Sequence, residues 1–100
     1  MKTKRISGEV RRRQIIDTAL GLAEEVGYAR VTRDMIAGEL DIGGPNVQHH
    51  VGNMQALRES IMARAVETKN LKVIAQGIAL RDPAALGLSL EVRTLAKMEL

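Results

Sequence analysis

The segment Asp41-Ile42-Gly43-Gly44-Pro45 limits most strongly what this chain can fold into. Two adjacent glycines give the backbone the freedom that a tight turn needs, and proline is tolerated at the first position of a following helix. Before this segment, Thr32 can cap a short helix whose apolar residues recur at spacings of three and four. The sequence therefore predicts two short helices joined by a tight turn within residues 31–57, with Asn53 capping a further helix.

The second short helix, Pro45 to Val51, separates apolar from polar residues. Val47 and Val51 are four residues apart, which places them on one face of a helix. The other directions hold polar side chains, namely Asn46, Gln48, His49 and His50. A side-chain amide carries a donor beside an acceptor and therefore matches the major-groove edge of adenine. The pattern is typical of a helix-turn-helix, although plain helical bundles also contain short helices joined at glycine.

This stretch and the helix before it resemble the N-terminal DNA-binding domain of the tetracycline-repressor family. The resemblance runs without a gap over roughly half of the chain and rests on these residues: Ile15, Ile16, Ala19, Leu20, Leu22, Glu25, Val26, Gly27, Val31, Thr32, Ile36, Ala37, Leu40, Ile42, Pro45, Val47, His50, Val51, Asn53, Ala56 and Leu57. The chain departs from the family at three positions. Asp41 stands where the family usually has glycine, Gln48 where it has a DNA-contacting tyrosine, and Met54 where it has a phosphate-contacting lysine.

Composition predicts an all-α fold with an aliphatic core. The chain has one tyrosine and no phenylalanine or tryptophan, and it shows no alternation of apolar and polar residues with a period of two. We expect about five helices: a three-helix DNA-binding domain with a helix-turn-helix, followed by two C-terminal helices. The first helix spans residues 9–26, with a buried stripe from Ile16 to Val26. Gly27 ends it, and Tyr28 covers the core with its hydroxyl in water.

Basic residues gather at the N-terminus. Residues 1–14 hold six basic residues against the single acidic Glu9: Lys2, Lys4, Arg5, Arg11, Arg12 and Arg13. Beside a helix-turn-helix, a basic arm is expected to hold phosphates, whereas taken alone it is equally well a solvated tail. Arg33, at the start of the second helix, is a further phosphate candidate. The lack of aromatic residues favours duplex DNA over single strands or RNA, whose readers stack bases on exposed rings.

The part of the chain after Asn53 is expected to form two helices, over residues 54–80 and 84–100, with Asp82 capping the second. Only 34 residues follow Val66, too few to enclose a useful ligand pocket, so no small-molecule effector is expected. We divide the chain into a flexible basic arm (1–8), a helix-turn-helix domain (9–66) and a dimerisation segment (67–100). Packing of that segment onto the first helix is the alternative, and both roles can coexist.

Several classes of function find no support in the sequence. The chain has no cysteine, and its adjacent histidines, His49 and His50, lack the i, i+4 spacing of a helical zinc pair. No motif of nucleophilic catalysis and no phosphate-cradling loop is present. We therefore expect no metal, no cofactor and no enzymatic activity. No apolar run reaches the length of a membrane span or forms a secretory signal, so we expect a cytoplasmic protein, bacterial or phage if the resemblance holds.

These observations favour a sequence-specific regulator of transcription, most simply a repressor, that binds double-stranded DNA as a homodimer. Base contacts are expected from Asn46, Gln48 and His49. The groove wall or phosphates are expected to meet Arg33, Gly44, Pro45 and His50, together with the basic arm. Two alternatives stay open. One is a DNA-recognition adaptor of a phage packaging or replication machine, and the other is a protein-interaction module that has lost DNA binding.

Overall fold

The computed structural model describes residues 7–100, which contain helices and no strand. The all-α expectation is confirmed for this part of the chain. The elements follow in the order α1 (Gly8–Val26), the short 3-10 helix η1 (Tyr28–Arg30), α2 (Arg33–Leu40), α3 (Gly44–Val51), α4 (Met54–Glu67), α5 (Leu71–Ala79), α6 (Pro83–Leu86) and α7 (Leu90–Lys97). Seven α-helices therefore replace the five expected, because both predicted C-terminal helices are broken.

Polar side chains define where most of the helices begin. Thr32 and Asn53 accept hydrogen bonds from the backbone N–H of Met35 and Ala56, as the sequence predicts. Asp82 accepts from the N–H of Ala84 in the same manner. Three caps were not expected: Ser7, Asn70 and Ser89. Ser7 starts α1 at Gly8, one residue earlier than predicted, and the other two caps begin the additional helices.

The predicted helix over residues 54–80 is wrong in its middle. It ends at Glu67 and restarts at Leu71, because Lys69 adopts a left-handed backbone with φ of 55°. The N–H of Asn70 bonds to the carbonyl of Ala65 at 2.7 Å, and the Asn70 side chain caps α5. The side-chain amide of Asn70 also donates to Glu24 at 2.7 Å, which ties the turn to α1.

The predicted helix over residues 84–100 is also wrong. The one-turn helix α6 ends at Leu86, and α7 begins at Leu90 after Ser89 caps it by accepting from the N–H of Val92. The N–H of Leu88 bonds back to the carbonyl of Ala85, which turns the chain away from the helical path. α7 then packs across α5, with Ala96 fully buried between them.

The turn between α2 and α3 is built differently from the expectation. The left-handed residue is Asp41 (φ 54°, ψ 49°), whose N–H bonds to the carbonyl of Ala37 and ends α2. Gly43 has a φ of −73° and precedes α3, and Gly44 is already its first residue. The two glycines therefore supply no left-handed conformation. Aspartate is one of the few side chains that tolerate this region, and it takes that role here.

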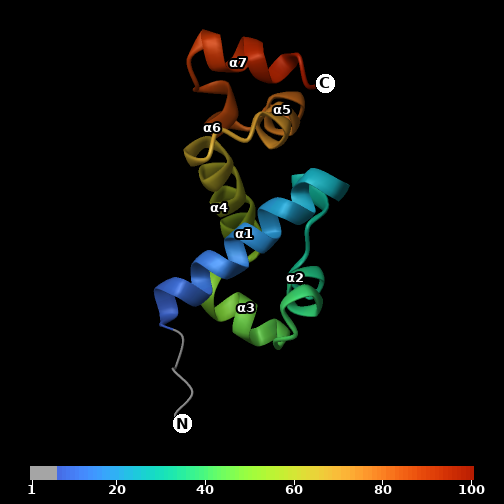
Figure 1. Cartoon of the computed structure of the whole chain (residues 1–100), viewed down its shortest axis with the longest axis vertical. Coiled ribbons are helices and arrows are strands. Elements are labelled where there is room, and N and C mark those ends of the chain that lie inside the picture. Colours follow the sequence, from blue (N-terminus) through green and yellow to red (C-terminus); the bar gives the residue numbers. More distant parts are fainter. Residues whose placement is uncertain (1–6) are drawn as a thin grey trace.

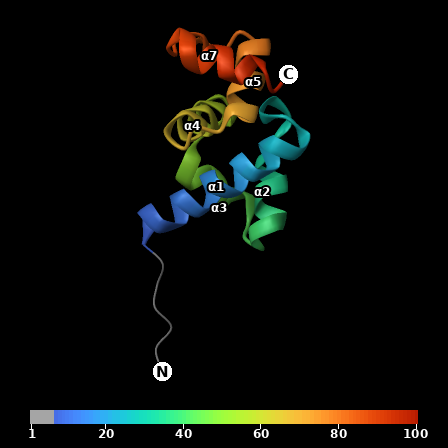
Figure 2. The same cartoon turned by 45° about the horizontal axis from the view of Figure 1, so that its top comes forward.

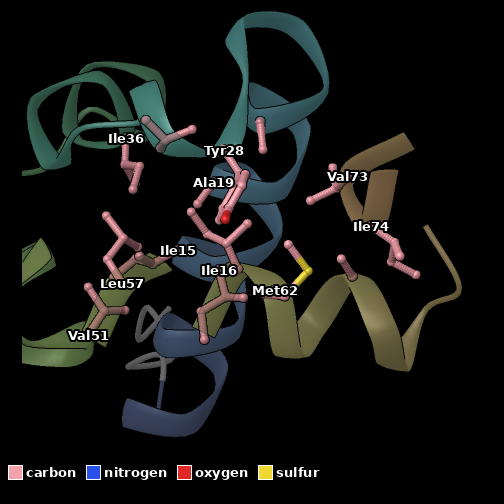
Figure 3. Close-up of a cluster of buried hydrophobic side chains, with 14 of the residues drawn as sticks. Ile15, Ile16, Ala19, Tyr28, Ile36, Val51, Leu57, Met62, Val73 and Ile74 are labelled. Atoms are coloured by element: carbon pink, nitrogen blue, oxygen red, sulfur yellow. The ribbon is translucent and has the colours of Figure 1, made fainter. Parts of the chain in front are cut away.

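One hydrophobic core, aliphatic except for Tyr28, contains buried residues of every helix. Figure 3 shows the part of it around α1. Ile15, Ile16 and Ala19 of α1 meet side chains from α2, α3 and α4, and the core continues to Val73 and Ile74 of α5. Val26 was expected to belong to the buried stripe of α1, and this is wrong, since its side chain is exposed. It lies at the last position of α1, where the helix leaves the core.

A polar network ties the C-terminal helices to α1. Gln76 of α5 accepts from the backbone N–H of Tyr28 at 2.8 Å and donates to the carbonyl of Ala23 at 2.9 Å. The Tyr28 hydroxyl donates to Asp82 Oδ2 at 3.1 Å. The expectation that this hydroxyl faces water is therefore wrong, because Asp82, which also caps α6, lies beside the ring.

The helices lie in three groups along the length of the molecule. α2 and α3 lie at one end of the molecule and α5, α6 and α7 at the other, with α1 and α4 between them (Figure 1). A second view keeps α7 and α3 on opposite sides of α1 (Figure 2). Within residues 7–100, no helix has both the length and the apolar character that crossing a membrane requires.

Candidate nucleic-acid interface

α3 is anchored by two apolar side chains and presents polar ones. Val47 is completely buried and Val51 nearly so, and both join the common core. Asn46, Gln48 and His49 are exposed. The helix therefore turns its amides and one imidazole outward at the end of the molecule away from α7 (Figure 1).

The remaining predicted residues of α3 lie around this polar row. Pro45 is exposed at the second position of the helix, whereas Gly44 and His50 are half-buried. The imidazole rings of His49 and His50 meet edge to face, with centroids 5.2 Å apart and planes at 75°. His50 thus points partly along the protein surface, and His49 is the more accessible of the two rings.

Arg33 lies closer to this row than the sequence indicated. It is the first residue of α2, and its guanidinium Nη1 donates a hydrogen bond to Gln48 Oε1. Its Nε would be 3.8 Å from a Cβ placed on Gly44, one helical turn before Gln48. The guanidinium therefore runs along one turn of α3, and the Gln48 side chain is not free. The two residues are fifteen positions apart, and no local sequence pattern predicts their contact.

A shallow hollow adjoins the pair. Its walls come from the start of α2, the end of α3 and the start of α4, and it is lined by Thr32, Arg33, Asp34, Gln48, Val51, Gly52, Asn53, Met54 and Leu57. The starts of α2 and α4 belong to these walls, where Thr32 and Asn53 cap the N–H groups of Met35 and Ala56 and where Asp34 adds a carboxylate. Met54, half-buried, supplies apolar surface here and no charge.

The arginines of the first turns of α1 lie on a separate groove. Arg12 and Arg13 line the space between α1 and α4 together with Val10. Arg12 Nη2 donates to Ser60 Oγ at 3.4 Å, and Arg11 Nη1 donates to Gln14 at 3.2 Å. The other predicted arm residues, Lys2, Lys4 and Arg5, lie outside the described residues.

The arginines that line this groove differ in whether they form an ion pair with a carboxylate. Arg64 forms an ion pair with Asp17 at 2.8 Å and with Glu67 at 3.1 Å, and the Asp17 hydrogen bond raises the pKa of Arg64. Among residues 7–100, Arg12 and Arg13 have no carboxylate within ion-pair distance. Their charge is therefore the more available for an external anion.

The described residues are balanced in charge overall. Removing Lys2, Lys4 and Arg5 from the fifteen basic residues leaves twelve, which equals the twelve acidic residues. Attraction to a polyanion from this part of the chain must therefore come from the local arrangement of charges and not from net charge. Comparisons of the chain with protein-family models, with curated proteins and with solved structures found no match.

Proposed function

We propose that this chain is a sequence-specific regulator of transcription that binds double-stranded DNA as a dimer, with a helix-turn-helix of the tetracycline-repressor type. The observation that carries the proposal is the two-sided character of α3. Two buried valines hold the helix, and Asn46, Gln48 and His49 stand exposed on it. An amide-bearing helix that protrudes from a compact core suits insertion into the major groove, which is wide enough to admit it.

The neighbouring elements support a phosphate-binding role around α3. The starts of α2 and α4 line the hollow beside it, and the backbone N–H groups of helix N-termini are common phosphate contacts. Arg12 and Arg13 belong to the first turns of α1, which packs against α3. Cations at these sites would hold the duplex while α3 reads its bases.

The C-terminal helices support the proposed dimer. Large apolar side chains are exposed there: Leu80, Leu86, Leu90, Leu95, Met98 and Leu100. Such a concentration at one end of a small protein marks an interaction surface. Self-association at this end would leave both copies of α3 free for two half-sites.

The test is selection of duplexes from a random library, followed by affinity measurement on the selected site and on random DNA. Asn46→Ala should cost about 1–3 kcal/mol on the selected site and little on random duplexes. Gln55→Ala is the matched control. It removes an exposed side-chain amide that bonds to Glu59 and keeps every backbone N–H group at the start of α4, so it should change neither affinity. Equal losses on both DNAs for Asn46→Ala would show that α3 is not the reading helix.

Two observations favour a second candidate, a protein-interaction module. The described residues carry no net charge, and Asp34 Oδ1 lies 3.4 Å from the position of a Cβ on Gly44, so a carboxylate adjoins the first turn of α3. A carboxylate there lessens attraction to phosphate. Absence of any salt-dependent duplex binding by the full chain would favour this candidate over the regulator.

A further inference from the structure

The contact between Arg33 and Gln48 fixes which way the Gln48 amide faces. A guanidinium has five N–H donors and no acceptor, so only the oxygen of an amide can bond to it. Gln48 therefore turns Oε1 toward Arg33, and its NH2 group faces away from the guanidinium. Both side chains are exposed, and no other partner is recorded for the Gln48 nitrogen within residues 7–100.

This orientation changes what Gln48 can recognise. A glutamine reads adenine with both of its polar atoms, because Oε1 accepts from the N6 amino group while Nε2 donates to N7. Here Oε1 already accepts from Arg33. An amide oxygen has two lone pairs, so the adenine N6 amino group could still donate to it, but it would have to approach beside the charged guanidinium, which crowds two donors on one oxygen. Guanine presents two acceptors, O6 and N7, which match an amide that offers its NH2 group.

We propose that Arg33 is a positioning residue that turns Gln48 Oε1 toward itself and leaves the Gln48 NH2 group to contact bases, so that the Gln48 position prefers guanine to adenine. The inference rests on the proposed function and deepens it by naming the base that this side chain recognises. Arg33 acts here through Gln48, and its remaining N–H groups stay available for acceptors nearby. The same donors also suit phosphate oxygens, which carry no base identity, so base preference is the property to measure.

The experiment uses the full chain and duplexes that carry the selected site with each base pair exchanged in turn. For the wild type, one position in each half-site should prefer guanine over adenine by about tenfold or more. Arg33→Ala releases Oε1, so the preference at that position should vanish or turn toward adenine while the other positions keep theirs. Gln48→Glu keeps an acceptor for Arg33 and removes the donor, so it should abolish the guanine preference.

Arg30→Ala is the matched control, because Arg30 is an exposed arginine of η1 outside the walls of the hollow beside Gln48. It should leave the preference at every position unchanged. A uniform loss of affinity for Arg33→Ala, with every preference intact, would overturn the proposal and make Arg33 a phosphate contact only. Selection of adenine at that position by the wild type would also overturn it. Failure of the wild type to bind any duplex would instead remove the proposed function itself, and circular dichroism shows that each variant is folded.

Discussion

The Tyr28 hydroxyl donates a hydrogen bond to Asp82 Oδ2 across 54 residues of sequence, and this contact joins η1, which follows α1, to the N-cap of α6. Tyr28 is nearly buried, and burial raises the pKa of its hydroxyl to about 12, with the hydrogen bond and the negative charge of Asp82 acting in the same direction. The coupling between the two halves of the molecule is therefore sensitive to alkaline pH.

In the folded protein Tyr28 keeps its proton up to about pH 12, whereas in the unfolded chain it ionises near its ordinary pKa of about 10. The raised pKa of Tyr28 therefore contributes about 1–2 kcal/mol to the free energy of unfolding. This contribution is complete below pH 10 and is lost as the pH rises toward 12. Tyr28 is the only tyrosine, so tyrosinate absorbance reports its titration directly. Tyr28→Phe should flatten this part of the stability curve, and a hydroxyl that titrates near pH 10 would contradict the buried contact.

Gln76 should matter more for stability than its partial exposure suggests. Gln76→Ala removes the acceptor of the Tyr28 N–H and the donor to the Ala23 carbonyl, and unsatisfied polar groups away from water cost about 1–3 kcal/mol each. Urea unfolding measures the loss. Gln55→Ala, on the surface of α4, should change the free energy of unfolding by less than about 0.5 kcal/mol. Equal effects of the two substitutions would mean that the network adds nothing.

Gly77 marks a close approach of α5 to α4 and α6. A Cβ added there would lie 2.9 Å from the Cβ of Ala85 and 2.5 Å from Cε of Met62. Met62 can rotate away, but the Ala85 methyl moves only with the backbone of α6. Gly77→Ala should therefore destabilise the protein by about 1–3 kcal/mol. Gly21→Ala, on the open face of α1, should instead stabilise it by up to about 1 kcal/mol, and thermal unfolding compares the two.

The salt dependence of DNA binding tests the role of the α1 arginines. Arg12→Ala should weaken binding to selected and random duplexes alike and lower the slope of log affinity against log salt by about one. Lys72→Ala removes one positive charge from α5, at the opposite end of the molecule, and should leave the slope unchanged. Identical slopes for all three proteins would place Arg12 away from the phosphates.

Self-association through α7 is tested by a charge at Leu90. Leu90 is 70% exposed and is the first residue of α7, where the helix dipole favours an acidic side chain. Leu90→Glu should therefore leave the fold intact and shift the protein from dimer to monomer in sedimentation equilibrium. Gln55→Glu adds the same charge on α4 and should keep the dimer. A dimer that tolerates Leu90→Glu would assign the interface elsewhere.

The sequence predicts those parts of this fold that depend on neighbours along the chain. Thr32, Asn53 and Asp82 cap helices as expected, because a cap needs only a few adjacent residues. The breaks near Lys69 and Ser89 were missed, since lysine rarely takes a left-handed conformation and serine is unremarkable inside a helical pattern.

Contacts between side chains far apart in the sequence could not be predicted from it. Nothing near Arg33 in the sequence shows that its guanidinium meets Gln48, and nothing near Tyr28 shows that Asp82 accepts its hydroxyl. Both contacts depend on how helices cross, which packing of the whole core decides. The exposure of Asn46, Gln48 and His49 was expected from the spacing of two valines, whereas the orientation of the amide required the structure.

The residues of α3 that hold it in the core are different from the residues that it exposes. Val47 and Val51 alone insert this helix into the interior, so its outer residues can be exchanged without opening a void. Under the proposed function, three or four outward side chains of α3 could change and alter target recognition, with little effect expected on the stability of the fold. Changes in these exposed residues would then be constrained by the need to bind the DNA target and hardly at all by the need to fold.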